Sequence, residues 1–357
     1  MKLRWAALGW VALACASGAP APEHASNAAK AAESAEIAFP PTGPVDLRPA
    51  GSPHEGTLYQ LLMSYEGRTE VSEDRPGASE DRTRMVDEKV SLQIDYREMP
   101  VATPTSAEIA SSLVLEALNR RMRMSPPGEE HVIEIGDDRL RVQVNNKVET
   151  DLRGAQPKQD LTPRTVLGKS FALVLDDALG NPKVITIRGI PPAKKMLVTL
   201  PLRESLGYLQ IGYPDHPVSP GDTWHAKRFF PNPIGKLGLA VDVELRLVGF
   251  ERLGEAPCAR VVLRSFVDAK DVNSEVGFAF DEVRLQLTGD AWLDLETGQV
   301  AAARIEDVAA VSYHKTAAAI PARVRMRYES RSALQRLDSL AASATWADGT
   351  KRFSAVK

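Results

Sequence analysis

The chain has 357 residues, with 44 Lys and Arg against 47 Asp and Glu, a net charge of -3 and 43% hydrophobic residues. This composition is ordinary for a globular protein and excludes a wholly disordered chain. A nucleic-acid-binding protein needs a basic face, so the balance of charge argues against nucleic acid as a partner. The length allows two domains or one large β architecture.

The first 15 residues have the pattern of a secretory signal peptide. Lys2 and Arg4 supply a short positive start. The apolar run from Trp5 to Ala14 is too short to span a bilayer as a helix, and no later run is long and apolar enough to do so. We therefore expect an exported protein.

The end of this leader can be cleaved in two ways. Ala14-Cys15-Ala16 fits ordinary signal peptidase, which requires small residues. The same region also resembles a bacterial lipobox, in which Cys15 becomes the lipidated N-terminus, although Ala12 stands where Leu is usual. Cysteine is otherwise present only at Cys258, so we favour lipidation at Cys15. The expected location is the bacterial cell envelope, with a lipid anchor in the outer membrane.

The rest of the chain divides by composition. Residues 16–55 are rich in Ala, Pro and Ser and bury too little apolar surface to fold, so we expect a disordered tether. An N-terminal β lobe is expected over residues 56–212 and a C-terminal β lobe over 213–335. Residues 336–357 are expected to form a flexible tail.

The N-terminal lobe shows mostly a period of two. The pattern predicts a first strand over 58–65 that ends at Gly67, a loop over 70–81, and a second strand over 85–96. Residues 106–124 fit a helix or a strand, and we favour a strand in the second half.

The lobe continues with short strands and one helical pattern. The predicted strands are 131–135, 140–144, 171–175 and 184–187, and the last two form a hairpin at Gly180-Asn181. Residues 193–208 are compatible with a helix, which Pro201 would kink.

The C-terminal lobe has the clearest strand of the chain at 239–247, where apolar and polar residues alternate. Further strands are predicted at 258–266, 278–295, 299–313 and 322–333, with turns at 253–254 and 296–299, and a short helix is expected over 333–342. The hairpins at 171–187 and 291–305 are alike, which leaves open a duplication of the lobe. The predicted fold is mainly β with minor α: curved antiparallel sheets or half-barrel lobes with one or two short helices.

A proline-rich connection precedes the second lobe. In this segment Pro217 fixes φ, Gly221 permits a turn, Asp222 can accept backbone N–H bonds, and Trp224 anchors the next strand in the core. We expect these four residues to form a structural motif.

Three segments together, Gly168 to Gly189, Pro214 to Trp224 and Gly289 to Val300, resemble a family of uncharacterised bacterial envelope lipoproteins. In the third segment Trp292 stands where Phe is commoner in the family. The resemblance implies a fold like that of the lipoprotein-carrier half-barrels, in which a curved antiparallel sheet wraps around a helix. This family has no assigned activity, so the resemblance implies no catalytic residues.

The chain has no recognisable catalytic or metal-binding motif. Its histidines lack the spacing of a zinc site, and Asp215, His216, Asp222 and His225 are the nearest approach to a cluster. There is no Gly-x-Ser-x-Gly, phosphate-binding loop or Ser-x-x-Lys. Cys258 lies in a strand pattern and is expected to be a buried thiol. We therefore expect no enzyme activity, no cofactor and no metal.

The leading hypothesis is a non-enzymatic envelope lipoprotein whose curved sheet binds a lipid, an acyl chain or a lipidated partner on an apolar face. Strands 239–247 and 278–293 would contribute to that face. The alternative is a structural or protein-interaction module tethered to the envelope. A third reading, an exported hydrolase, would require His216, His225 and nearby carboxylates to converge.

Overall fold

The structure is a computed structural model that describes most of the chain after residue 38. The described residues are 39–48, 57–73, 82–99, 108–126, 128–136, 139–153, 167–168, 170–176, 181–187, 211–231, 238–273, 278–315 and 322–337. The chain forms two compact units, Met1–Glu36 and Ile37–Lys357, and all described residues belong to the second.

The described part of the second unit is one antiparallel sheet of 14 strands. The strands are β1 (Thr57–Glu73), β2 (Arg82–Met99), β3 (Glu108–Ser125), β4 (His131–Ile135), β5 (Arg139–Val144), β6 (Lys147–Arg153), β7 (Ser170–Asp176), β8 (Asn181–Ile187), β9 (Thr223–Pro231), β10 (Gly238–Leu253), β11 (Ala256–Asn273), β12 (Phe278–Asp294), β13 (Val300–Lys315) and β14 (Ala322–Leu337). The prediction of a mainly antiparallel β fold is confirmed. Within these ranges no helix occurs that is long and apolar enough to cross a membrane.

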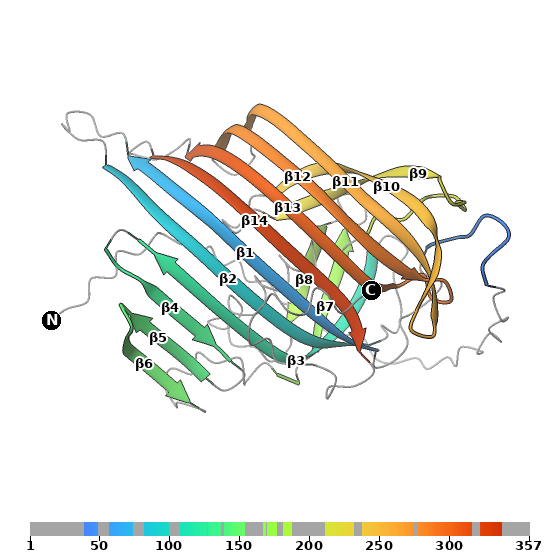
Figure 1. Ribbon diagram of the computed structural model, residues 1–357, viewed down its shortest axis with the longest axis horizontal. Helices are drawn as coiled ribbons and strands as arrows, with labels where there is room; N and C mark the ends of the chain where they lie inside the picture. The colour runs from blue at the N-terminus through green and yellow to red at the C-terminus, as the bar shows by residue number, and fades with distance from the viewer. Residues whose placement is uncertain are drawn as a thin grey trace, which may run out of the picture. The chain divides into compact units, whose positions relative to one another are not determined.

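The strand order places the first and the last strand of the chain next to each other at the middle of the sheet. It runs β6-β5-β4-β3-β2-β1-β14-β13-β12-β11-β10-β9, so that β1 and β14 lie side by side (Figure 1). The sheet also forks at β3, whose C-terminal part pairs with β4 and whose N-terminal part pairs with β7, followed by β8. In all these pairs the strands are antiparallel.

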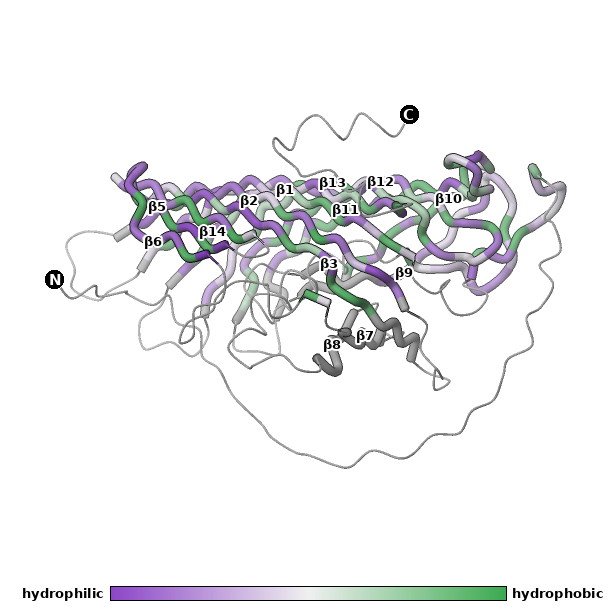
Figure 2. Tube along the Cα trace, turned by 90° about the horizontal axis from the view of Figure 1, so that it is seen from below, coloured by the Kyte–Doolittle hydropathy of each residue, from purple (hydrophilic) through white to green (hydrophobic). Residues whose placement is uncertain are grey.

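The long strands alternate between apolar and polar residues, as the changing colours along each strand show (Figure 2). Side chains of a strand point to opposite faces in turn, so a period of two gives the sheet one apolar and one polar face. The side of the sheet with the apolar side chains is called the apolar face below. Its buried residues include Ile94, Leu61, Leu334, Ile305, Leu263 and Leu245. We call polar face the opposite side, which carries residues such as Lys89, Arg68, Arg331 and Glu306.

Strand β1 continues through Gly67, where the sequence predicted its end. Gly67 lies opposite Tyr328 of β14, on the apolar face. A Cβ at Gly67 would lie 2.9 Å from Cβ of Tyr328 and 3.0 Å from the carbonyl oxygen of Arg327. The rings of Tyr65 and Tyr328 pack with centroids 5.3 Å apart beside this position. The glycine therefore makes room for aromatic packing within the strand and does not end it.

Other strand boundaries also differ from the prediction. Residues 70–73 belong to β1 and not to a loop, and all of 108–125 is strand β3. Strand β6 was not predicted, because its sequence is polar and shows no apolar face. It forms a hairpin with β5 through a turn in which Asn145 and Asn146 have positive φ. The helix expected over 333–342 is wrong for residues 333–337, which lie in β14. The helical pattern at 193–208 lies outside the described residues.

Part of the expected tether packs on the sheet. Val45 forms reciprocal backbone hydrogen bonds of 2.9 Å with Val218, and Leu47 is buried in the main apolar cluster. The alternation of apolar and polar residues does not reveal such a contact, because the contact depends on two isolated apolar residues. The division into two lobes at residue 213 stays a prediction, and the sheet contains strands from both sides of it.

The packing at Gly67 gives a test of the β1–β14 pairing. We expect Gly67→Ala to lower the free energy of unfolding by about 1–3 kcal/mol, because the added Cβ overlaps Tyr328. Urea unfolding of both proteins measures the difference.

The matched control is Gly249→Ala in β10, where an added Cβ meets no atom within 4 Å. This variant should stay within about 0.5 kcal/mol of the wild type. Equal effects of the two substitutions would contradict the packing described for Gly67.

Candidate functional site

The centre of the apolar face is built from small side chains. Ala291 of β12, Ala303 and Ala309 of β13, and Ser330 and Ser332 of β14 are all buried there. Leucine and isoleucine side chains surround them on the same face. Small and large side chains thus stand next to each other on this part of β12, β13 and β14.

One carboxyl group lies within this region. Asp307 of β13 is 2% exposed and stands between Leu287 of β12 and Ser330 of β14 in the strand register. The Ser330 hydroxyl donates a hydrogen bond to Oδ1 of Asp307. Asp307 is thus a buried acid with one partner, set in an apolar surrounding.

Among the described residues, two oxygen atoms of this region lack hydrogen-bond partners. They are Oδ2 of Asp307 and the hydroxyl oxygen of Ser332, which is 1% exposed. Ser332 lies opposite Ile305, so it is a diagonal neighbour of Asp307 on the same face. A buried polar atom without a partner costs about 1–3 kcal/mol, and proteins rarely leave one without a reason.

Burial raises the pKa of Asp307, and the hydrogen bond from Ser330 lowers it by a smaller amount. The resulting pKa is about 7, above the ordinary value of an aspartate. Below this pH the carboxyl group is protonated and can donate as well as accept a hydrogen bond. Above it, the group is an acceptor only.

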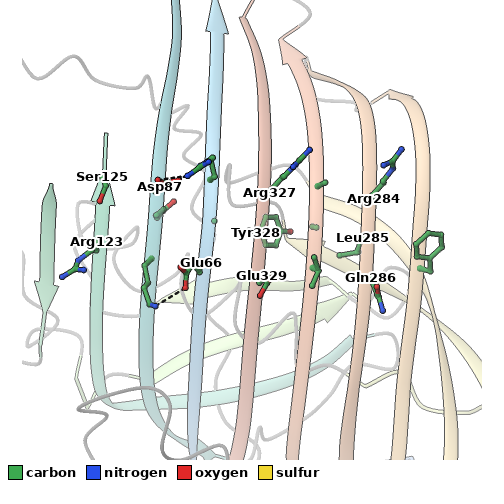
Figure 3. A pocket seen from close by; sticks show the side chains of 18 residues that line it. Glu66, Asp87, Arg123, Ser125, Arg284, Leu285, Gln286, Arg327, Tyr328 and Glu329 are labelled. Carbon is green, nitrogen blue, oxygen red and sulfur yellow. Dashed lines mark hydrogen bonds and ion pairs between the residues drawn. The ribbon is translucent and has the colours of Figure 1, made fainter. Parts of the chain in front are cut away.

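The polar face has a broad hollow of about 1100 Å³ over β1, β2, β3 and β11 to β14 (Figure 3). Its lining includes Glu66, Arg68, Phe266, Val308, Arg327 and Glu329. Phe266 and Val308 are the large apolar side chains of this lining that reach solvent, 73% and 53% exposed. The hollow thus combines both signs of charge with two exposed apolar side chains.

Like charges face each other across the β1–β14 pairing in this hollow. Arg68 lies opposite Arg327, and Glu66 lies opposite Glu329. Side chains directly opposite in an antiparallel pair have Cβ atoms about 4.5–5.5 Å apart, at which like charges destabilise the pair. Residues of β2 offset the charges of the two β1 residues by forming ion pairs with them: Arg68 binds Asp87 at 2.6 Å, and Lys89 binds Glu66 at 3.1 Å.

The proline-rich segment packs at the other end of the sheet. Gly221 has a positive φ of 101°, which favours glycine. Asp222 accepts the backbone N–H of Ser219 at 2.8 Å. Trp224 is 7% exposed, and its indole N–H donates to the carbonyl of Gly212 at 2.8 Å. Pro217 lies in the same segment and is exposed. These contacts hold the segment in place before β9.

The histidines that an exported hydrolase would need at one site do not come together in the described part of the chain. His216 contacts the adjacent Asp215 at 2.6 Å, whereas His225 is exposed on β9. No group of three or more His, Cys, Asp or Glu in the described ranges could hold a metal ion. Cys258 is a buried free thiol, as predicted, and burial raises its pKa to about 11. Cys15 lies outside the described residues.

Sequence reasoning missed Asp307, although a signal was present. In β13 the inward positions run Ala303, Ile305, Asp307, Ala309 and Val311, so a period of two places the acid among apolar residues. The missing hydrogen bonds could not be found in this way, because they depend on the neighbours that β14 supplies.

No family model matches the chain, and no curated protein sequence matches it. Among solved structures, lipovitellin matches with a TM-score of 0.38 and 10% identity, over 80% of this chain and 25% of that chain. The chain therefore spans about a quarter of the lipovitellin chain. The translocator domain of the autotransporter NalP from Neisseria meningitidis matches with a TM-score of 0.19 and 8% identity, over 80% and 90% of the two chains. These scores are too low to carry an argument about function, and the family resemblance stays a prediction.

The raised pKa of Asp307 predicts a defined pH dependence of stability. In the unfolded chain this carboxyl group ionises near pH 4, whereas the folded chain keeps its proton up to about pH 7. The folded state binds more protons within this window, so the stability contributed by this group falls as the pH rises through it. Asp307→Asn removes the titration.

The free energy of unfolding of the wild type, minus that of Asp307→Asn, should fall by on the order of 4 kcal/mol between about pH 4 and about pH 7, and stay level above. Urea unfolding of both proteins at several pH values measures this difference. A constant difference across the window would show that Asp307 is not held in its protonated form.

Proposed function

We propose that the protein is a non-enzymatic envelope lipoprotein that binds a neutral apolar ligand with a hydroxyl group on the apolar face of its sheet. The observation that carries the proposal is the pair of buried oxygens without partners, on Asp307 and Ser332. Ligand sites for apolar molecules are mainly hydrophobic with a few placed polar groups, which is the composition of this region.

The side chains around the two oxygens favour an acyl chain or a similarly slender ligand body. Ile305 and Ala309 flank the acid on its own strand, and Leu287 lies beside it on β12. Small residues allow close approach at the centre, while the leucine and isoleucine side chains around them offer apolar contact.

The chemistry of the two oxygens favours a hydroxyl group on the ligand. A ligand hydroxyl can donate to Oδ2 of Asp307 and accept from the hydroxyl of Ser332, which satisfies both atoms. A fatty-acid anion would instead bring a second negative charge next to Asp307 whenever that group is ionised. A neutral lipid such as a monoacylglycerol fits this pattern better.

The location and the lack of catalysis are parts of the proposal that rest on the sequence. The leader and Cys15 support export and a lipid anchor in the cell envelope. The lack of a catalytic motif supports a binding role.

A second candidate is a protein-interaction module that uses the polar face. The exposed side chains of Phe266 and Val308 in the charged hollow favour it, because apolar residues rimmed by charges are typical of interaction surfaces. This role does not require Asp307 or Ser332.

Titration of the full-length protein with a monoacylglycerol that carries a fluorescent acyl chain tests the lipid-binding proposal. Ser332→Ala should lower the affinity about fivefold, the equivalent of one hydrogen bond of about 1 kcal/mol. The variant should fold normally, because it removes a buried atom that has no partner.

Ser64→Ala on the polar face of β1 is the matched control, and its affinity should equal that of the wild type. Native mass spectrometry of protein purified from membranes should also reveal a bound lipid. No saturable binding and no bound lipid would overturn the proposal in favour of the second candidate.

A further inference from the structure

Strand β14 carries a row of arginines along the polar face: Arg323, Arg325, Arg327 and Arg331. Three of them have acidic partners on neighbouring strands. Arg323 contacts Asp281 at 3.3 Å, Arg325 contacts Glu70 at 3.7 Å, and Arg331 contacts Glu306 at 3.5 Å. Within the described part of the chain, no ion pair is found for Arg327.

The neighbours of Arg327 explain why it differs from the rest of the row. On the β1 side it faces Arg68, and on the β13 side it faces Ala310. Glu329, two residues further along the same strand, faces Glu66 and Val308. The described residues give Glu329 no ion pair either. Two opposite charges therefore stand on one strand, each next to a like charge and an apolar residue.

The direct pairing of like charges adds no stability to the β1–β14 contact, and a ligand that carries both signs of charge would neutralise Arg327 and Glu329 together. Residues two apart on a strand lie about 6.8 Å apart, so the two side chains offer a positive and a negative point at that separation. Both line the hollow of the polar face, and Figure 3 shows them on the same strand, one on each side of Tyr328.

We propose that Arg327 and Glu329 form a binding site for a zwitterionic phosphoethanolamine group. Its phosphate would contact Arg327, with Arg68 and Arg284 in the same row of the hollow, and its ammonium would contact Glu329. Guanidinium groups match phosphate oxygens in geometry, and a carboxylate pairs with an ammonium group. The two-carbon link of ethanolamine separates the charges further than the single carbon of an amino acid does, which fits the spacing better.

The exposed apolar side chains are a second element of this site. Val308 lies directly opposite Glu329, and Phe266 follows beyond Gln286 in the same row. They can contact the carbon atoms of a ligand whose charged ends lie on β14. Because the charges are solvent-exposed, we expect weak binding that decreases with added salt.

The test is a titration of the full-length protein with soluble phosphoethanolamine, followed by calorimetry or by NMR of the arginine side chains. Arg327→Gln and Glu329→Gln should each lower the affinity at least fivefold. Phosphate alone and ethanolamine alone should bind more weakly than the combined molecule. Arg331→Gln, which removes a paired arginine of the same row, should bind as the wild type does.

A stability measurement separates binding from folding. Arg327→Gln removes the repulsion from Arg68, so its Tm should equal or exceed that of the wild type. Vesicles of phosphatidylethanolamine and of phosphatidylglycerol distinguish the source of the group. If the protein binds only the phosphatidylethanolamine vesicles, the ligand is a lipid headgroup. If it binds soluble phosphoethanolamine but neither kind of vesicle, the ligand is a free metabolite. Equal affinity of wild type, Arg327→Gln and Glu329→Gln would overturn the proposal, and so would an equal loss in Arg331→Gln.

Discussion

The pairing of β1 with β14 holds this sheet together. Other neighbours along the main path follow one another in the chain, whereas β1 and β14 are its first and last strands, with Leu58 opposite Leu337 and Glu73 opposite Ala322. Without this pairing the strands would form two separate antiparallel sheets. Long-range pairing has a cost in chain entropy, which the buried contacts along the whole length of both strands must offset, among them those of Tyr65 and Tyr328.

Both proposed sites lie at or beside this pairing, one on each face. On the apolar face, β14 supplies the two serines next to Asp307. On the polar face, β1 and β14 place like charges opposite each other. In each place the sheet departs from what stability alone favours, by leaving a buried oxygen without a partner or by bringing like charges together. Such departures are expected where a surface serves binding rather than folding.

The alternation of apolar and polar residues predicted most of the strands, because one face of each long strand must be buried. It predicted β10 well, since Val241, Val243, Leu245 and Leu247 are all buried. It did not predict the passage of β1 through Gly67, which depends on a tyrosine of a distant strand. Neither the neighbours of Asp307 nor those of Arg327 could be read from local sequence, because the register between β1, β13 and β14 brings them together.

The register of β1 against β14 can be measured directly by cysteine cross-linking. Ser64 lies opposite Arg331 on the polar face, whereas Ser332 points to the other face. Because a disulfide requires Cα atoms about 4.4–6.8 Å apart and Cβ atoms that face each other, the pair Ser64→Cys and Arg331→Cys should cross-link readily on oxidation. The pair Ser64→Cys and Ser332→Cys should not. Cross-linking of the second pair but not of the first would contradict the register on which both proposed sites depend.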